Sequence, residues 1–248
     1  MVLKIENISK AFGAVKAVDS VSFDIHEGEI MGLIGPNGAG KTTLTRLITG
    51  EYQADSGQIN FFGKNIVGLA PHEICHLGIS RTYQIPQPFP DMTAILNVVV
   101  GVLCGKHRVQ QTFGDALLEA SHCLEMVGLF GKRNVLARDL TLFELRSLEL
   151  ARALATTPKL ILIDEVMAGL NPGEGSRAVH LIRRLKDEYH LTILWIEHVM
   201  KVIMEASDRV QVLSYGKKIA EGAPKTVVND PVVIEAYLGK KYAQSRIS

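Results

Sequence analysis

Residues 35–42 have the types and spacing of a phosphate-binding loop. They read Gly-Pro-Asn-Gly-Ala-Gly-Lys-Thr, which matches the pattern G-x-x-x-x-G-K-[ST]. The glycines let the backbone curl so that successive N–H groups point at phosphate oxygens. Lys41 then reaches the β- and γ-phosphates, and the Thr42 hydroxyl coordinates Mg²⁺. The pattern therefore predicts a cradle for a nucleoside triphosphate.

The segments on either side of this loop support the prediction. Residues 29–34 form a short apolar run typical of a strand, and residues 42–49 carry apolar side chains at helical spacing. A helix that begins near Lys41 adds the positive end of its dipole to the loop. Strand, glycine-rich loop and helix in this order are what a phosphate-binding motif requires.

Two acidic residues follow another apolar run. Residues 159–164 read Lys-Leu-Ile-Leu-Ile-Asp, and Glu165 comes next. In open α/β sheets, ligands bind at the carboxyl ends of the strands. One carboxylate at that edge is able to hold Mg²⁺, directly or through water, and a second is able to orient or deprotonate an attacking water. Asp164 and Glu165 are therefore candidates for these two roles.

Three further candidates are unremarkable when taken alone. His198 follows the apolar run 191–196, and a neighbouring strand end would bring its imidazole to the γ-phosphate, although a lone histidine is more often structural. Gln84 opens a connector, residues 84–90, whose three prolines block helix and ladder hydrogen bonds. Phe12 would by itself be assigned to the core.

The remaining pattern predicts a parallel sheet interrupted by helices. A helix over 175–189 lies between the runs 159–164 and 191–196, which is the order of a βαβ crossover. Residues 92–155 have helical spacing with few strand candidates. Further strands are expected over 2–8, 20–25, 57–62, 209–214 and 218–221, a helix over 146–154, and a small C-terminal helix that ends at Gly239.

Composition limits the classes of function. The chain has 248 residues, of which 47% are hydrophobic, enough for one large α/β domain or for a domain with a small lobe. Its 27 Lys and Arg against 26 Asp and Glu leave a net charge of +1, which offers no electrostatic footprint for nucleic acid. We expect no secretory signal and no membrane span, and docking to a membrane stays open.

With these motifs in this order, the chain resembles the ATP-binding subunits of ABC transporters over nearly its whole length. Residues 35–43 resemble the Walker A loop, and Asp164 and Glu165 resemble the Walker B aspartate and the catalytic glutamate. Gln84 is similar to the Q-loop glutamine, which in the family contacts Mg²⁺ and links the nucleotide to the membrane subunits. His198 resembles the switch histidine, and Phe12 resembles the aromatic residue that stacks on adenine.

The family's signature sequence, Leu-Ser-Gly-Gly-Gln, is altered here to Leu-Thr-Leu-Phe-Glu over residues 140–144. In the family, the serine hydroxyl and the glycine N–H groups bind the γ-phosphate of the ATP that the opposite subunit holds. Thr141 keeps a hydroxyl that is able to cap a helix. Leu142 and Phe143 replace glycines that permit close approach to a ligand, and Glu144 adds a negative charge. Two interpretations stay open. In the first, which we favour, this signature is a weak half of the composite ATP site formed with the opposite subunit. In the second, Thr141 and the helix N-terminus suffice to bind the γ-phosphate, and Leu142 and Phe143 pack against a partner.

The resemblance implies a set of site residues with ATP and Mg²⁺ as cofactors. The implied catalytic residues are Glu165, His198 and Gln84. The implied metal ligands are Thr42, Gln84 and Asp164. The implied nucleotide contacts are Phe12, Gly35, Pro36, Asn37, Gly38, Ala39, Gly40, Lys41, Thr42, Thr43 and Thr141.

The expected fold is α/β: a P-loop, RecA-like core with an antiparallel β subdomain and an inserted helical subdomain. We expect one ABC ATP-binding domain over 1–248, with residues 1–84 and 157–248 in the core and residues 85–156 in the helical subdomain. Three stretches, 78–84, 168–172 and 230–239, are similar to branched-chain amino acid importers of the LivG type. ATPases for urea, lipopolysaccharide and amides share parts of them.

The resemblance implies ATP hydrolysis that drives import of amino acids, with branched-chain ones favoured. The implied partners are two membrane permeases and a second ABC ATPase, with which the chain forms a head-to-tail dimer; we favour a heterodimer. An external solute-binding protein is an indirect partner, and no nucleic acid is expected. The implied location is peripheral, on the cytoplasmic face of the membrane. The alternatives are a soluble ABC ATPase of DNA repair or translation, an importer of urea or amides, and a regulatory subunit with little catalysis, against which Glu165 argues.

Overall fold

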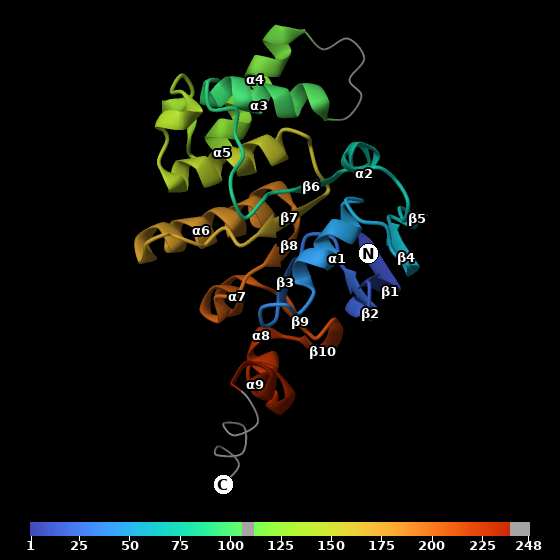
Figure 1. Cartoon of the computed structure of the whole chain (residues 1–248). Coiled ribbons are helices and arrows are strands. Elements are labelled where there is room, and N and C mark those ends of the chain that lie inside the picture. The colour runs from blue at the N-terminus through green and yellow to red at the C-terminus, as the bar shows by residue number, and fades with distance from the viewer. Residues whose placement is uncertain (106–111, 239–248) are drawn as a thin grey trace. The chain divides into compact units, whose positions relative to one another are not determined.

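The computed structural model describes residues 1–105 and 112–238. The chain forms two compact units (Figure 1). Residues Met1–Pro71 and the chain from Thr192 onward make the first unit, and residues His72–Leu191 make the second. The predicted core, residues 1–84 and 157–248, and the predicted helical subdomain, residues 85–156, have other boundaries, because they follow the type of element. That predicted division stays a prediction.

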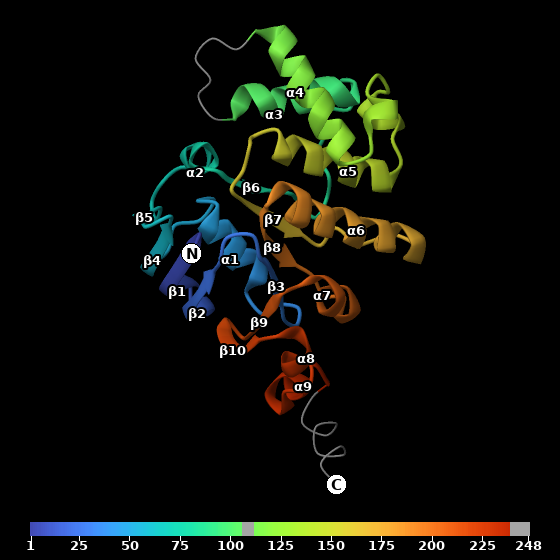
Figure 2. The same ribbon diagram turned by 180° about the vertical axis from the view of Figure 1, so that it is seen from behind.

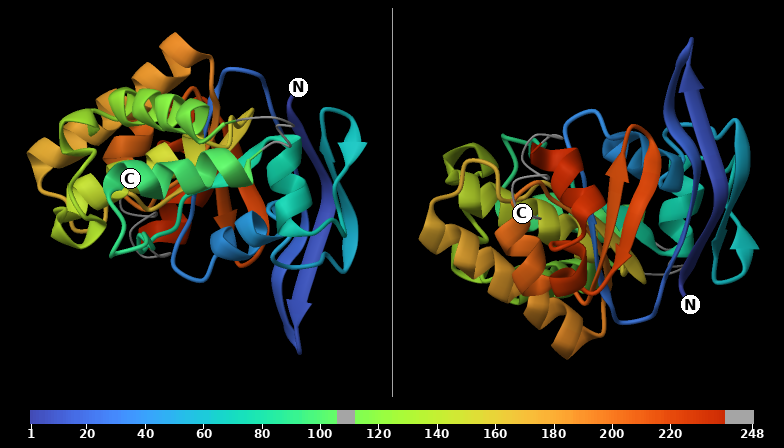
Figure 3. Two further views of the ribbon diagram at one scale, coloured as in Figure 1. Left: turned by 90° about the horizontal axis from the view of Figure 1, so that it is seen from above. Right: turned by 90° about the horizontal axis from the view of Figure 1, so that it is seen from below.

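The first unit contains an antiparallel sheet in the order β2-β1-β4-β5. Its strands are β1 (Leu3–Phe12), β2 (Val15–Ile25), β4 (Ser56–Phe61) and β5 (Lys64–Asn65). Alternate residues Val21, Phe23 and Ile25 of β2 are buried, as their period-2 pattern predicts. Figure 3 shows β1 and β2 as the long blue strands that run side by side.

Strands β1 and β2 are longer than the sequence pattern indicated. Their pairing register shifts at three places, and Asn7 and Ser20 have positive φ of 50° and 54°. Such bulges reset which face each side chain points to, so the alternation breaks although the strand continues. The predicted strands over 2–8 and 20–25 are therefore only parts of β1 and β2.

The first unit also contains strands β10, β9, β3 and β8, which are neighbours in this order. Strand β3 (Ile30–Ile34) pairs in parallel with β8 (Thr192–Ile196) and β9 (Arg209–Ser214), and β10 (Lys217–Gly222) pairs antiparallel with β9. Every residue of β3 and β8 is buried, as the continuous apolar runs predict. The helices of this unit are α1 (Lys41–Ile48), α7 (Met200–Ala206), α8 (Pro224–Val227) and α9 (Pro231–Leu238).

The second unit combines two parallel strands with a group of helices. Strand β6 (Ile79–Arg81) pairs with β7 (Leu160–Asp164). Helices α3, α4 and α5 pack against one another, and α4 lies across α3 in both opposite views (Figures 1 and 2). The helical elements are α2 (Pro71–Leu77), α3 (Ala94–Cys104), α4 (Phe113–Met126), two 3-10 turns (Phe130–Lys132 and Ala137–Asp139), α5 (Leu142–Leu154) and α6 (Pro172–Tyr189).

Several elements differ from the prediction. Helix α5 begins at Leu142 rather than at residue 146, and α6 begins at Pro172 rather than at 175, because each has a capping box at its start. Short elements that carry little periodicity, β6 among them, were not predicted. The predicted C-terminal helix end, Gly239, lies outside the described residues, within which α9 ends at Leu238. Over 1–105 and 112–238, no helix has the length and apolar character needed to cross a bilayer.

Candidate functional site

The phosphate-binding loop lies between β3 and α1, as predicted. Its glycines have positive φ: 155° at Gly35, 76° at Gly38 and 101° at Gly40. A Cβ atom at Gly35 would lie 2.2 Å from the Leu213 carbonyl oxygen, and one at Gly40 would lie 2.2 Å from the Ala17 carbonyl oxygen. Both positions therefore need glycine for conformation and for space.

Lys41 and the start of α1 present positive charge to this loop. The Lys41 side chain is 7% exposed, and its Nζ donates to the Gly35 carbonyl at 2.6 Å and to the Pro36 carbonyl at 3.1 Å. The ammonium therefore lies within the curl of the loop. Gly40 is the N-cap of helix α1, which therefore has no side-chain cap, and the first turn of the helix has no acidic residue. Its first N–H groups are thus oriented for an anionic ligand.

The other loop residues vary in exposure. Asn37 and Thr42 are exposed, Pro36 and Thr43 are half-buried, and Ala39 is buried with its N–H donated to the Pro36 carbonyl at 3.1 Å. The exposure of Thr42 suits the predicted role of a metal ligand, because binding needs no rearrangement of packed side chains.

Phe12 and His198 also belong to the first unit. Phe12 is the last residue of β1 and is 46% exposed, so it does not belong to the core. Its ring meets the edge of Tyr52 with 5.3 Å between centroids, which holds its orientation. His198 lies two residues beyond β8 and is exposed, while Glu197 before it is fully buried.

In the second unit, Gln84 and Glu165 are brought into direct contact. The Gln84 Nε2 donates to the Glu165 Oε2 at 2.5 Å. Glu165 follows β7 with φ of 45°, a left-handed conformation that is uncommon outside glycine. Backbone strain of this kind is found where surrounding structure holds a side chain in a required direction.

Asp164, the last residue of β7, has different hydrogen-bond partners from Glu165. Its side chain is buried and accepts a hydrogen bond from the Arg81 guanidinium at 2.8 Å. The Asp164 N–H donates to the Thr82 hydroxyl at 3.3 Å. The buried carboxylate is thereby compensated, as a buried charge must be. Arg81 was not a sequence candidate.

The altered signature forms the start of α5. Thr141 is the N-cap, and its hydroxyl accepts from the Glu144 N–H while the Glu144 carboxylate accepts from the Thr141 N–H at 2.9 Å. Lys132 donates to the same carboxylate at 2.7 Å. Burial alone would raise the pKa of Glu144, but the hydrogen bonds from Lys132 and Thr141 bring it below its usual value. The Glu144 charge is therefore partly compensated within the chain.

The two apolar residues of the altered signature have different surroundings. Leu142 is 41% exposed, and its side chain packs over Gly169. Phe143 is half-buried, and the Arg177 guanidinium lies 4.8 Å from the centroid of its ring. Phe143 thus packs against α6 of its own chain.

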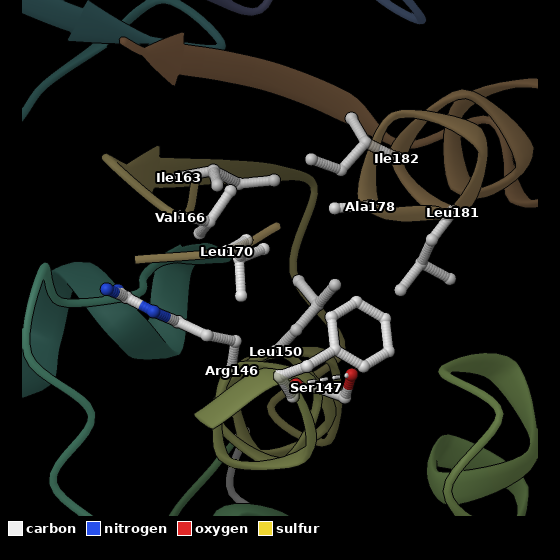
Figure 4. A pocket seen from close by; sticks show the side chains of 10 residues that line it. Arg146, Ser147, Leu150, Ile163, Val166, Leu170, Ala178, Leu181 and Ile182 are labelled. Carbon is white, nitrogen blue, oxygen red and sulfur yellow. Dashed lines mark hydrogen bonds between the residues drawn. The ribbon is translucent and has the colours of Figure 1, made fainter. Parts of the chain in front are cut away.

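Phe143 also belongs to the lining of a small apolar pocket in the second unit, between α5, β7 and α6 (Figure 4). The Arg146 side chain extends from α5 away from Ala178 and Leu181 (Figure 4). The lining residues are Phe143, Arg146, Ser147, Leu150, Ile163, Val166, Leu170, Ala178, Leu181 and Ile182. This pocket is part of the packing of the helix rather than a site for a polar ligand.

Sequence reasoning missed the residues of α5 that contact residues 83–89, the segment that contains Gln84 and is called the Gln84 segment below. Glu149 is 7% exposed and accepts from the Tyr83 N–H at 3.0 Å, and Arg146 is 8% exposed. A signal was present, because Glu149 stands between Leu148 and Leu150 in the helix predicted over 146–154. An acidic residue in such a position requires a partner.

Comparison with known proteins gives two family matches. The ABC transporter family model matches residues 18–168. A model described as branched-chain amino acid ATP-binding cassette transporter matches residues 217–243.

Curated relatives match over nearly their whole length. The high-affinity branched-chain amino acid transport ATP-binding protein BraF of Pseudomonas aeruginosa is 37% identical, with 96% of this chain and 98% of the relative covered. LivG of Escherichia coli, which has the same description, is also 37% identical with the same coverage.

Solved structures agree with these matches. The ADP conformation of MJ1267, an ATP-binding cassette of an ABC transporter, has a TM-score of 0.88 and 36% identity, covering 96% of this chain and 99% of that one. A nucleotide-free ATP-binding cassette from an ABC transporter has a TM-score of 0.86 and 34% identity, covering 96% and 99%. The predicted fold class and family resemblance are thereby confirmed.

Proposed function

The chain belongs to the ABC transporter family of ATP-binding cassettes and is an ATPase, and from this premise we propose that it powers import of amino acids, in particular branched-chain ones, through partner membrane permeases. The observation that carries the proposal is the likeness to BraF and LivG along almost the entire chain, with the branched-chain family model over residues 217–243. That model covers β10 and the C-terminal helices, outside the segment matched by the general family model.

The chemistry proposed for the first unit is triphosphate binding. Backbone N–H groups of residues 37–42, other than that of Ala39, which is donated to Pro36, and the uncapped start of α1 would bind the phosphates, and Lys41 would neutralise their charge. Phe12, partly exposed beside Tyr52, would stack on the base. His198 would contact the γ-phosphate.

The proposed Mg²⁺ ligands fit the chemistry of that ion. Thr42, Gln84 and Asp164 offer a hydroxyl, an amide and a carboxylate oxygen, which are hard donors. The structure shows no cluster of three His, Cys, Asp or Glu side chains anywhere in its described residues. Such a sparse protein donor set suits Mg²⁺ held mainly by phosphate oxygens and water. When bound, Mg²⁺ would reduce the repulsion between the phosphates and the attacking water.

Glu165 is the proposed general base. Its carboxylate would orient an attacking water and accept its proton, and the Gln84 amide fixes the direction of the carboxylate through the 2.5 Å hydrogen bond. Gln84 therefore both orients the base and stands at the start of the connector to the proposed permeases.

We further propose a head-to-tail heterodimer with a second ABC ATPase, located on the cytoplasmic face of the membrane. Each composite site would pair the Walker A loop of one chain with the signature of the other. A self-capped start of α5, with Glu144 bonded to Thr141 and Lys132, supports a weak half-site on this chain. Its own loop would then belong to the more active site. An external solute-binding protein would deliver the amino acid to the permeases.

The test is solute uptake by the reconstituted transporter. The chain would be purified with its encoded permeases and companion ATPase, placed in proteoliposomes, and assayed with radiolabelled leucine, urea and acetamide in the presence of the solute-binding protein. We expect ATP-dependent leucine uptake that Lys41→Ala abolishes. Uptake of urea or acetamide instead would assign a different substrate class, and failure to associate with any permease would favour a non-transport ATPase.

A further inference from the structure

Helix α5 holds the backbone of the segment that contains Gln84. The Glu149 Oε1 accepts a hydrogen bond from the Tyr83 N–H at 3.0 Å. Arg152 donates to the Gln87 carbonyl at 2.6 Å, and its guanidinium lies 5.2 Å from the Phe89 ring centroid. The segment is thus bonded to α5 on both sides of Gln84.

Arg146 extends the same attachment to the loop that carries Glu165. Its guanidinium donates to the Tyr83 carbonyl and to the Ala168 carbonyl, each at 3.4 Å. These two bonds are long and individually weak. Together they join α5 to the segment after β6 and to the loop after β7, which are the two segments that meet in the hydrogen bond between Gln84 and Glu165.

Glu149 is the buried anchor of this arrangement. Its side chain is 7% exposed, and its Oε2 has no hydrogen-bond partner among the residues that the structure describes. Arg146 and Arg152 on α5 and Arg81 on β6 are the charged groups whose fields act on it. A buried carboxylate between two leucines is costly for packing alone, since an apolar residue of similar size would avoid the loss of hydration. Its position therefore points to a role in holding Tyr83.

We propose that Glu149 is a positioning residue for ATP hydrolysis: through the Tyr83 backbone it keeps the Gln84 amide in contact with the Glu165 carboxylate. The proposal rests on the roles given to Gln84 and Glu165 in the proposed function. Within the second unit the Glu149 carboxylate accepts its hydrogen bond from the Tyr83 backbone next to Gln84, so its removal should act on turnover through Gln84.

The first test measures backbone protection in the full chain. Hydrogen–deuterium exchange would be followed over residues 82–89 in wild type, Glu149→Ala, Glu149→Gln and the control Glu125→Gln, which changes an exposed glutamate on α4. We expect Glu149→Ala to speed exchange in this segment and the control to leave it unchanged. Glu149→Gln keeps an oxygen acceptor for the Tyr83 N–H and a similar volume, so it should retain most of the protection. Unchanged exchange in Glu149→Ala would overturn the proposal.

The second test is steady-state ATPase activity of the assembled transporter. Loss of the hydrogen bond from the Tyr83 N–H should lower kcat about tenfold in Glu149→Ala, with KM for ATP changed by less than about threefold. Glu149→Gln should recover most of kcat, because the acceptor is restored. A rise in KM without a fall in kcat would contradict a positioning role.

A double-mutant cycle identifies the residue through which Glu149 acts. If it acts through Gln84, the variant Glu149→Ala/Gln84→Ala should be no slower than Gln84→Ala, whereas additive losses would overturn the proposal. Normal turnover in Gln84→Ala would remove the role of Gln84 from the proposed function, and the positioning role would fall with it. Slow turnover in Gln84→Ala with normal turnover in Glu149→Ala would overturn the positioning role alone.

Discussion

Glu165 combines a strained backbone with a fixed side chain. Its φ of 45° costs on the order of 1 kcal/mol, and its carboxylate is bonded to Gln84. We expect Glu165→Gln to preserve ATP binding and to reduce turnover by ~10²-fold or more, since a positioned general base contributes about that much. The measurement is ATPase rate and nucleotide affinity in the assembled transporter. Glu188→Gln, an exposed change on α6, is the control, and full turnover in Glu165→Gln would refute the assignment.

The stability of the chain should depend on pH through Glu149. Burial raises the pKa of this carboxyl group from 4.5 to about 7. The Tyr83 N–H and the guanidinium groups of Arg146, Arg152 and Arg81 act in the opposite direction and lower the pKa, but burial has the larger effect. The folded state binds the Glu149 proton more tightly than the unfolded state does. Protonation of Glu149 therefore stabilises the fold, and this contribution is fully present at pH values below the unfolded pKa of 4.5. It is lost as pH rises through about 7.

The corresponding change in the free energy of unfolding is on the order of 3 kcal/mol for a shift of this size. Urea unfolding of the full chain at pH 5 and pH 8 measures it, and we expect Glu149→Gln to remove most of the difference because its amide does not ionise. Glu125→Gln should behave like wild type. An equal pH dependence in wild type and Glu149→Gln would show that other groups cause it.

At the scale of elements, local chemistry determined the helix starts more closely than hydrophobic spacing indicated. Helices α4, α5 and α6 each begin with a capping box, Thr112 with Asp115, Thr141 with Glu144, and Asn171 with Glu174. Each pair is visible in the sequence at a separation of three residues. The ion pair of Arg81 with Asp164 joins residues 83 positions apart, and no local pattern could have predicted it.

The start of α5 leads to a prediction about the altered signature. We expect the variant Leu142→Gly/Phe143→Gly/Glu144→Gln to raise the ATPase rate of the isolated chain, because it removes bulk and a negative charge from the helix N-terminus. Stability should fall by about 2 kcal/mol, since the Phe143 ring leaves its place beside Arg177.

Two comparisons separate the causes in this prediction. Glu144→Gln alone tests the charge, because Gln still completes a capping box. In the assembled complex, removing the catalytic glutamate from one chain at a time tests the asymmetry. Equal losses from the two chains, or fast hydrolysis by the purified wild-type homodimer, would count against a weak half-site.

For the whole molecule, the order of motifs was sufficient to predict the fold. The prediction placed the phosphate loop between β3 and α1 and the acidic pair at the end of β7, because each depends on a short apolar strand with a distinctive local sequence at its end. The contacts that connect α5 to the Gln84 segment could not be predicted in this way, because Glu149 and Tyr83 are 66 residues apart. Spacing within one helix does not identify what its buried face will touch.

Membrane association is part of the proposed function, and it rests on the proposed permease partners rather than on a spanning segment. No helix within the described residues crosses a bilayer, and the net charge of +1 gives little attraction to anionic lipid. For attachment through the proposed permeases, the connector offers apolar surface at Ile85 and Phe89, which are 72% and 44% exposed. We expect the chain to fractionate with membranes when its encoded permeases are co-expressed and to remain in the supernatant without them.

Ile85→Ser/Phe89→Ser should reduce the membrane-bound fraction, and the matched surface change Leu118→Ser on α4 should not. A chain that stays in the supernatant beside its permeases and binds nucleic acid would belong to the non-transport class instead.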